Sequence, residues 1–333
     1  MKFTIFAGTL NAFGGRELVT LATVKTLKDF FPSYEIELLT IDRPNIERLN
    51  RILGYDLVAP SLLKRIWKPL GMFPIGSIWK TFPYMRIVNM AVKSWSGSAN
   101  VMVMNLAADL YPMIPATISY VHALFFGVKV HAGSGLRAKV RKEISLEALS
   151  KCKIILVNSK FTKKVLLALD SSIAQKVKVL YPPITLKPMN DSLFLRSLSQ
   201  RKPVVLTISR FSPEKKLETI FEIAAQLPRV EFIMVGSLHV KEYFEQLAKK
   251  ASRVSNVKLL PNVSREELLN LMRHSMIYLH MAPHEPFGIS VVEAMSQGLV
   301  PVVHKSGGPW KDILEERDGL YGYGYRSIFE AIQ

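Results

Sequence analysis

Two glutamates near the C-terminal end of the sequence, Glu285 and Glu293, are spaced so that both can hold one polyhydroxylated ligand. They lie in HEPFGISVVEAM (284–295), where a loop is expected to give way to a helix, so Glu285 lies in the loop and Glu293 about one turn into the helix. A carboxylate can accept hydrogen bonds from two adjacent hydroxyls, which suits a sugar or a ribose. The N–H groups of Phe287 and Gly288 then lie at the helix N-terminus, where they stabilise negative charge.

The same stretch also contains residue types that bind metal ions. His280, His284 and Glu285 are at positions i, i+4 and i+5, and the i, i+4 pair of histidines serves zinc on a continuous helix. Pro283 and Pro286 exclude such a helix, because proline lacks an amide hydrogen and its ring clashes with the preceding turn. We therefore expect no metal ion at this site.

Two cations follow a predicted strand at 203–209. In SRFSPEKKLE (209–218), Arg210 and Lys215 flank a short loop that Pro213 closes at the entry of a helix. Both side chains can therefore point toward a diphosphate, which arginine would bind through two hydrogen bonds and lysine as a point charge. The alternative is an ordinary solvated basic loop.

Two glycines follow a predicted strand in the N-terminal half of the sequence. NAFGGRE (11–17) follows a predicted strand at 2–8 and opens a helix. Gly14 and Gly15 allow the backbone to approach a ligand closely, and the helix N-terminus offers N–H groups to a phosphate or a carboxylate. The stretch lacks G-x-G-x-x-G spacing, so a nicotinamide fingerprint is not indicated, and a plain tight turn is the alternative.

Two further features occur at strand ends. His122, in SYVHALF (119–125), carries an imidazole that can hydrogen-bond to a sugar hydroxyl or, as a lone histidine more often does, to a structural partner. KSGGPW (305–310) provides a Gly-Gly turn after the last predicted strand, which we expect at the rim of a ligand cleft.

All these residues follow short apolar strands that alternate with amphipathic segments. Strands are expected at 2–8, 35–41, 101–107, 117–123, 153–159, 203–209, 230–236, 257–261, 276–280 and 299–304. Helices are expected at about 16–31, 216–226, 240–251 and 289–297, and another after Ser264, which forms a capping box with Glu267. This alternation predicts parallel βαβ units.

The series is interrupted at 181–202, where three prolines and a lack of periodicity are typical of a linker. We therefore predict an α/β protein of two Rossmann-like, doubly wound domains that face one another across a cleft, with the ligand where the strand C-termini converge. The predicted boundaries are an N-terminal domain at 1–185, a linker at 186–202 and a C-terminal domain at 203–333. A chain of 333 residues, 49% of them apolar, is long enough for two such cores.

Composition excludes several classes of protein. The single cysteine, Cys152, rules out an internal disulfide framework and a cysteine-based zinc site, and it fits a reducing, cytoplasmic compartment. The N-terminal stretch reads as a first buried strand rather than a signal peptide. No apolar run is long enough to predict a transmembrane helix.

The charge is strongly basic, with 44 Lys and Arg against 27 Asp and Glu and a net charge of +17. Between Asp56 and Glu143 the only acidic residue is Asp109, and three of the four tryptophans, Trp67, Trp79 and Trp95, fall there. Basic side chains interleaved with aromatic residues predict peripheral contact with an anionic membrane surface. The alternative is a solvated basic surface over a tryptophan-containing core, and no nucleic-acid-binding module is found.

Taken together, Arg210-x4-Lys215, Glu285-x7-Glu293 with Pro-Phe-Gly between them, and the Gly14-Gly15 turn resemble the retaining GT-B glycosyltransferases of family 4. The resemblance covers nearly the whole chain. Within that family, FGISVVEAMSQGLVPVVHKSGGPWKDI (287–313) and several shorter phrases are similar to the GDP-mannose-dependent α-1,2-mannosyltransferases of lipid-linked oligosaccharide synthesis.

The resemblance implies a role for each candidate residue. Arg210 and Lys215 would bind the donor diphosphate and stabilise the charge that develops on the leaving group. Glu285 and His122 would contact the transferred sugar, Glu293 the ribose, and Phe287 and Gly288 would lie in the donor site. Gly14 and Gly15 would approach the phosphates and the acceptor. The resemblance implies no metal ion or other cofactor, and no enzyme nucleophile.

The implied reaction moves a hexose, mannose by preference, from a nucleotide diphosphate sugar such as GDP-mannose to a polyprenyl-linked glycan at the membrane surface. One alternative is a soluble GT-B transferase that uses another nucleotide sugar to make a disaccharide or a polysaccharide. The other is a GT-B-shaped scaffold without turnover, which the presence of all four charged donor-site residues disfavours.

Overall fold

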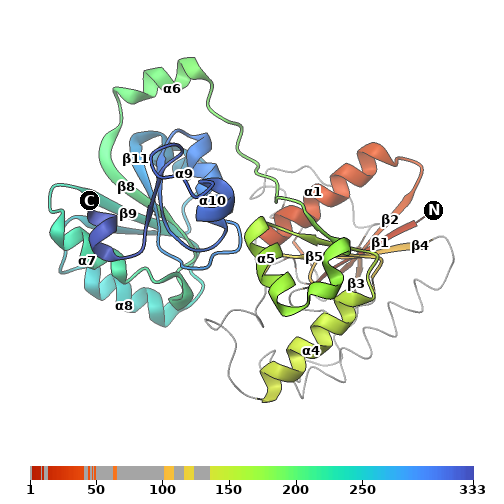
Figure 1. Ribbon diagram of the computed structural model, residues 1–333. Helices are drawn as coiled ribbons and strands as arrows, with labels where there is room; N and C mark the ends of the chain where they lie inside the picture. Colours follow the sequence, from red (N-terminus) through yellow and green to blue (C-terminus); the bar gives the residue numbers. More distant parts are fainter. Residues whose placement is uncertain are drawn as a thin grey trace. The chain divides into compact units, whose positions relative to one another are not determined.

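The computed structural model describes residues 2–8, 14–40, 101–108, 116–123 and 136–333, with Leu10, isolated positions at 44–49 and the backbone of 63–65 (Figure 1). The chain divides into two units, Met1–Pro183 and Ile184–Gln333. Each unit is built around its own sheet, and the described strand pairs are parallel. The predicted α/β class with two Rossmann-like units is therefore confirmed.

The sheet of the first unit has the strand order β3-β2-β1-β4-β5-β6-β7. Its strands are β1 (Lys2–Gly8), β2 (Glu35–Thr40), β3 (Leu63–Arg65), β4 (Val101–Asn105), β5 (Ile118–Val121), β6 (Ile154–Val157) and β7 (Val177–Val179). The helices in its described residues are α1 (Gly15–Phe30), α4 (Leu136–Ser150), α5 (Lys160–Leu169) and the 3-10 helix η2 (Ser171–Lys176). Phe3 to Gly8 of β1 are all buried, as expected of a central parallel strand covered on both faces.

The sheet of the second unit has the strand order β10-β9-β8-β11-β12-β13. Its strands are β8 (Lys202–Ile208), β9 (Glu231–Gly236), β10 (Val257–Pro261), β11 (Ser275–His280), β12 (Val300–His304) and β13 (Tyr323–Tyr325). Its helices are α6 (Asp191–Leu198), α7 (Thr219–Gln226), α8 (Lys241–Ala251), α9 (Arg265–His274), α10 (Ile289–Ser296) and α11 (Ile328–Ile332), with a 3-10 turn η3 (Pro213–Lys215) and a π turn η4 (Pro309–Ile313).

This strand order places a switch point at the centre of the second sheet. The chain runs outward from β8 through β9 to β10, and then returns to add β11 on the other side of β8. Ligands of open parallel sheets bind outside the carboxyl ends of the strands at such a point. The residues that follow β8 and β11 are therefore the ones that the fold brings to a binding position.

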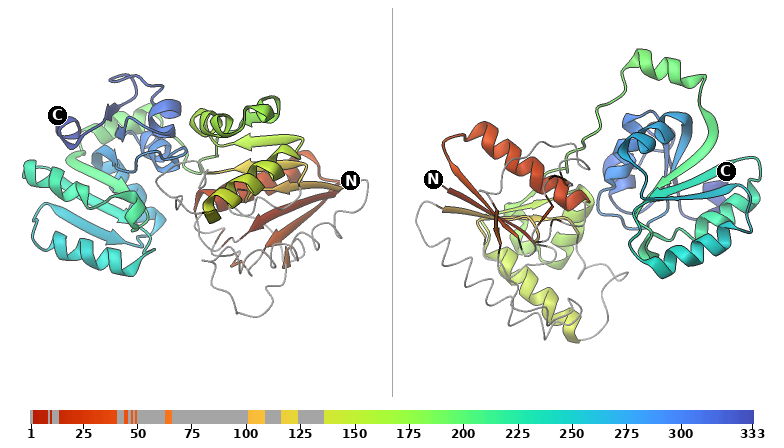
Figure 2. Two further views of the ribbon diagram at one scale, coloured as in Figure 1. Left: turned by 60° about the horizontal axis from the view of Figure 1, so that its bottom comes forward. Right: turned by 180° about the vertical axis from the view of Figure 1, so that it is seen from behind.

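Alternate residues of β9 serve two cores, one on each face of the sheet. Phe232 and Met234 pack with α7 and α8, whereas Ile233 and Val235 pack with α9 and α10. The ribbon shows α7 and α8 on one face of the sheet and α9 and α10 on the other (Figures 1 and 2). Helix α9 begins as predicted, because Ser264 accepts a hydrogen bond from the Glu267 N–H and the Glu267 side chain accepts one from the Ser264 N–H.

Residues 186–202, expected to be a linker, contain α6 and belong to the second unit. The Asn190 side chain caps this helix by accepting a hydrogen bond from the Leu193 N–H at 2.8 Å. The preceding segment is tied to α10, since the Met189 N–H donates to the Ser296 carbonyl at 2.8 Å. Its eight residues are too few to show a clear apolar period in the sequence.

The basic segment 57–142, for which membrane contact is predicted, lies largely outside the described residues, and so do Trp67, Trp79 and Trp95. Among the residues that the structure describes, every helix is too short or too polar to cross a lipid bilayer.

Candidate functional site

The centre of the candidate site is an ion pair between the ends of two adjacent strands. Lys215 ends η3, which follows β8, and Glu285 lies in the loop that follows β11. The Lys215 Nζ donates to the Glu285 Oε2 at 2.7 Å, and the two side chains are only 17% and 21% exposed. The sequence places both residues at strand ends, and the fold brings them into direct contact at the switch point.

The surroundings of Glu285 keep it ionised. Burial opposes ionisation, but the nearby Lys215 ammonium outweighs this effect and lowers the pKa of Glu285 to about 2. The Arg210 guanidinium contributes in the same direction, so both cations act on one carboxylate. A mostly buried negative charge with two cations around it is a preorganised polar site.

Arg210 lies in the loop between β8 and η3. Its Nη2 is 3.6 Å from the Glu214 Oε1, and its side chain is 46% exposed. Burial opposes ionisation of Glu214, but hydrogen bonds, including one from the Ser212 hydroxyl at 2.6 Å, lower its pKa. Arg210 therefore carries its guanidinium at the surface of the cluster, where an anion from solvent can reach it.

The Gly-Gly turn of residues 307–308 holds the loop that carries Glu285. The Gly308 N–H donates to the Glu285 carbonyl at 2.7 Å. A β-carbon on Gly307, whose φ is +87°, would lie 2.5 Å from that same carbonyl oxygen, and one on Gly308 would overlap the Pro286 carbonyl. Both positions therefore require glycine so that the two loops can lie against each other. The turn, expected at the rim of a cleft, directly supports the Glu285 loop.

Phe287 and Gly288 form the entry to α10. Phe287 is buried, and Gly288 takes up φ +95° as the N-cap residue of the helix. A β-carbon on Gly288 would lie 2.9 Å from the Pro309 Cγ, so this glycine serves both a left-handed turn and close packing. The predicted loop-to-helix transition is thus observed, with Glu293 in the second turn of α10.

Glu293 makes an ion pair that is not apparent in the sequence. The Arg265 Nη2 lies 3.1 Å from the Glu293 Oε1, and the same nitrogen donates to the Thr185 hydroxyl at 2.7 Å. Glu293 is 8% exposed, so a ribose at this carboxylate would have to share it with Arg265 or displace Arg265. Arg265 begins α9, and the contact is between residues far apart in the chain.

The charges of both carboxylates affect one buried tyrosine. The Tyr278 hydroxyl is 2.7 Å from the Ser290 Oγ and 3.1 Å from the Ile208 carbonyl oxygen. Burial raises the pKa of Tyr278, and the charges of Glu285 and Glu293 raise it further. Both glutamates therefore act on one phenol, whereas their contacts to a ligand stay predictions.

The first unit contains the remaining predicted residues, and Gly14 and Gly15 begin α1 there. The Gly14 N–H donates to the Glu17 Oε2 at 2.8 Å in a capping arrangement. The His122 Nε2 lies 3.0 Å from the Leu106 carbonyl oxygen, so its imidazole has a structural partner. The roles of these three residues toward a ligand stay predictions.

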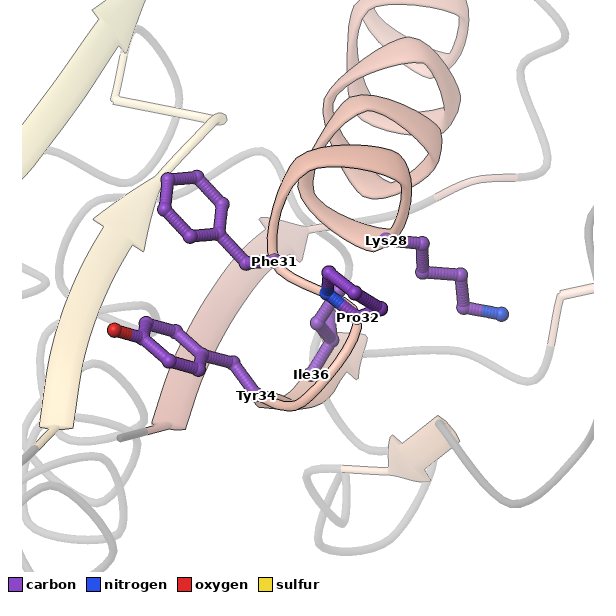
Figure 3. Close-up of a pocket in the computed structure, with 5 residues that line it drawn as sticks. All are labelled: Lys28, Phe31, Pro32, Tyr34 and Ile36. Carbon is purple, nitrogen blue, oxygen red and sulfur yellow. The ribbon is translucent and has the colours of Figure 1, made fainter.

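A shallow hollow at the other end of α1 is lined by Lys28, Phe31, Pro32, Tyr34 and Ile36 (Figure 3). The rings of Phe31 and Tyr34 stack at 5.3 Å. The hollow adjoins the N-terminal end of β2. Gly14 and Gly15 follow the C-terminal end of β1, which is the opposite end of these parallel strands. The hollow is therefore not at the C-terminal ends of the strands, where the ligand is predicted to bind.

His280 is the other residue near Glu285 whose contact the sequence does not reveal. Its Nε2 lies 3.9 Å from the Glu285 Oε2, and it is 7% exposed. Within the described part of the chain, His, Cys, Asp and Glu side chains form no group of three or more that could hold a metal ion.

The unit that carries this site is similar to known proteins. The model for "Glycosyl transferases group 1" matches residues 194–325, which include every candidate residue after β8. A GDP-Man:Man(3)GlcNAc(2)-PP-Dol alpha-1,2-mannosyltransferase of Dictyostelium discoideum is 27% identical over 157 residues, covering 42% of this chain and 31% of that protein. A trehalose synthase of Pyrococcus horikoshii is 31% identical over 144 residues, covering 40% of this chain and 34% of that protein.

The chain thus spans about a third of the length of these curated relatives. Among solved structures, the apo form of the lipopolysaccharide outer core galactosyltransferase WaaB has a TM-score of 0.66 at 16% identity, over 100% of this chain and 88% of that one. This likeness extends over both units and concerns the fold. Residues 194–325 therefore match the group 1 glycosyl transferases, and the chain has the two-unit α/β architecture of the GT-B fold.

Proposed function

We propose that this protein is a retaining glycosyltransferase that moves mannose from GDP-mannose to a lipid-linked glycan at a membrane surface. The observation that carries the proposal is the cluster of Arg210, Lys215 and Glu285 at the switch point of the second sheet. Its two cations suit a diphosphate, and its ionised carboxylate suits the hydroxyls of a hexose. The group 1 family match over this unit supports the same reaction class.

In this proposal, the bond between the anomeric carbon and the diphosphate breaks as the acceptor hydroxyl attacks from the same face, and the proton of that hydroxyl passes to the leaving diphosphate oxygen. Negative charge then develops on the leaving nucleoside diphosphate, and Arg210 and Lys215 stabilise it. The contact with Glu285 already holds Lys215 at the switch point before the donor binds. Glu293 in α10 contacts the ribose after Arg265 yields one of its hydrogen bonds.

Mannose and a lipid-linked acceptor are favoured by the relatives whose names specify both. The proteins of Dictyostelium discoideum, Mus musculus and Homo sapiens carry the same name and are 25–28% identical to this chain in the matched segments. We propose that the reaction needs no cofactor, because cationic side chains take the part that a metal ion plays in other transferases. The proposed location is peripheral, on the cytoplasmic face of a membrane, and the net charge of +17 suits anionic lipid.

A second candidate function follows from the trehalose synthase relative, which is 31% identical over 144 residues. The chain would then transfer a hexose from another nucleotide sugar to a free sugar in solution. The donor cluster serves either reaction, so the acceptor distinguishes the two.

The test is the transfer of radiolabelled mannose from GDP-mannose to a polyprenyl-diphosphate-linked oligosaccharide in detergent. We expect labelled lipid product from the native protein and from Glu245→Ala, a control whose carboxylate is exposed on α8. We expect a large loss from Glu285→Ala, with unchanged circular dichroism. Transfer to free glucose alone would favour the second candidate, and full activity of Glu285→Ala would remove this site from the reaction.

A further inference from the structure

His280 is a buried polar residue that the roles assigned so far leave unexplained. It is the last residue of β11, and its carbonyl accepts a hydrogen bond from the Tyr325 hydroxyl at 3.0 Å, which fixes the backbone at this point. Its Nδ1 is buried and has no hydrogen-bond partner. Its Nε2 faces the Glu285 carboxylate at 3.9 Å. A buried polar atom without a partner destabilises the fold, so this arrangement calls for an explanation.

The surroundings of His280 determine which ring nitrogen carries the proton. A proton on Nδ1 would leave a buried donor without an acceptor and would turn the lone pair of Nε2 toward a carboxylate. A proton on Nε2 instead directs an N–H toward that carboxylate, so this tautomer is favoured. Burial, together with the charges of Lys215 and His304, lowers the pKa of His280 to about 4 against the opposing effect of Glu285. The imidazole is therefore a neutral donor near pH 7.

Glu285 consequently has two neighbours of different character. Lys215 is a cation at hydrogen-bond distance, 2.7 Å, and His280 is a neutral donor that lies just beyond that distance. If the proposed function is correct, the donor diphosphate also attracts Lys215, and it carries more negative charge than one carboxylate. A movement of about 1 Å by the carboxylate then makes a hydrogen bond with the His280 N–H.

We propose that His280 is a positioning residue that holds the Glu285 carboxylate toward the hexose when the donor diphosphate engages Lys215. This inference rests on the proposed function and adds a residue to its site. A neutral imidazole suits the task because the diphosphate does not attract it as it attracts an ammonium. The end of β11 suits it as well, because a strand end is a more rigid support than the loop that carries Glu285.

Three substitutions separate positioning from packing. His280→Gln brings an amide nitrogen near the place of Nε2, so it keeps a donor for Glu285. His280→Asn brings its amide near the place of Nδ1, and His280→Leu fills the space without any donor. Leu also leaves no buried polar atom unsatisfied, so it serves if the Asn variant fails to fold.

The experiment is isothermal calorimetry of native protein and the three variants with GDP-mannose and with GDP. His280→Asn and His280→Leu are expected to weaken GDP-mannose binding about tenfold or more, the range for one hydrogen bond to a charged group, and to weaken GDP binding less, because GDP has no hexose for Glu285 to hold. His280→Gln is expected to restore most of the sugar-dependent affinity. A residue that only packs would change the affinity for both ligands by the same factor.

The inference is overturned if the ratio of GDP-mannose to GDP affinity stays native in the Asn and Leu variants. It is also overturned if Gln is as impaired as Leu. Failure of the native protein to bind either ligand is a different result, because it contradicts the proposed function itself.

Discussion

At the scale of single residues, the site depends on charges that are buried and paired. Glu285 is kept ionised by Lys215, and Glu293 is paired with Arg265 in a largely buried position. Removing one partner of such a pair leaves the other charge buried and uncompensated, which costs more than the pair itself contributes. Substitutions that keep the shape of the side chain but remove its charge therefore reveal the most about this site.

The lowered pKa values of His280 and Glu285 predict that the free energy of unfolding decreases in acid. The pKa of His280 in the folded state, about 4, lies below the ordinary value of 6.5, so the unfolded chain binds more protons between these values. Stability then falls as the pH drops from 6.5 to 4, by up to about 3 kcal/mol. The pKa of Glu285, about 2 against an ordinary 4.5, adds a further loss as the pH drops below 4.5.

Urea unfolding at a series of pH values checks this prediction. His280→Gln should flatten the slope between pH 6.5 and 4, because the titrating group is removed. His239→Gln, at an exposed position before α8, should keep the native slope. An unchanged slope in His280→Gln would show that other groups cause the acid sensitivity.

At the scale of elements, the site is held by loops that touch each other. The turn at residues 307–308 after β12 supports the loop at 284–288 after β11, through the Gly308 N–H bond to the Glu285 carbonyl. The position of the carboxylate therefore depends on two glycines that carry no chemistry of their own.

Gly307→Ala is expected to displace the Glu285 loop and to lower transfer activity at least tenfold, because its β-carbon would meet the Glu285 carbonyl at 2.5 Å. Gly319→Ala is a matched control. Gly319 has a similar positive φ, +84°, but its β-carbon would meet nothing within 4 Å. Both variants carry the strain of about 1 kcal/mol for alanine in this conformation, and only Gly307→Ala adds the clash.

Initial rates and melting temperatures of the two variants are the measurements. Equal activity in both would mean that the loop adapts to the extra methyl group, and the supporting role of the turn would be refuted.

Some of these elements could be predicted from the sequence and others could not. The helix after Ser264 was predictable because its capping box is local, four residues long. Helix α6 was missed within the expected linker because a short helix shows little periodicity. The residues that follow β8 and β11 could be chosen as site candidates from the sequence. The βαβ alternation predicts parallel strands, and ligands of such sheets bind outside the carboxyl ends of the strands.

The contacts among these residues were not predictable, because they depend on strand order. β8 and β11 are neighbours only because the chain crosses back at the switch point, so Lys215 meets a residue 70 positions away. The bridge from Arg265 to Thr185 and Glu293 likewise joins residues that are far apart in the chain. The spacing of residues along the sequence does not predict contacts between residues so far apart in the chain.

At the scale of the whole molecule, the excess of positive charge is the dominant feature, at +17. We predict that the protein sediments with vesicles that contain anionic lipid and that raising the salt concentration from 0.05 M to 0.5 M releases most of it, because salt screens attraction to a charged surface. Vesicles of neutral lipid should bind little protein at either salt concentration. Protein that stays in solution with both kinds of vesicle would contradict the proposed membrane partner and favour the soluble transferase.

The central claim is that the cluster at the switch point of the second sheet binds a nucleotide diphosphate sugar. Thermal unfolding with GDP-mannose, GDP, UDP, ADP and dTDP tests it most directly, because a ligand that binds only the native state raises the melting temperature. We predict a shift with GDP-mannose in the native protein and in Lys241→Met, whose side chain is 82% exposed on α8, and little or none in Lys215→Met. No shift with any of these nucleotides, or the native shift in Lys215→Met, would contradict it.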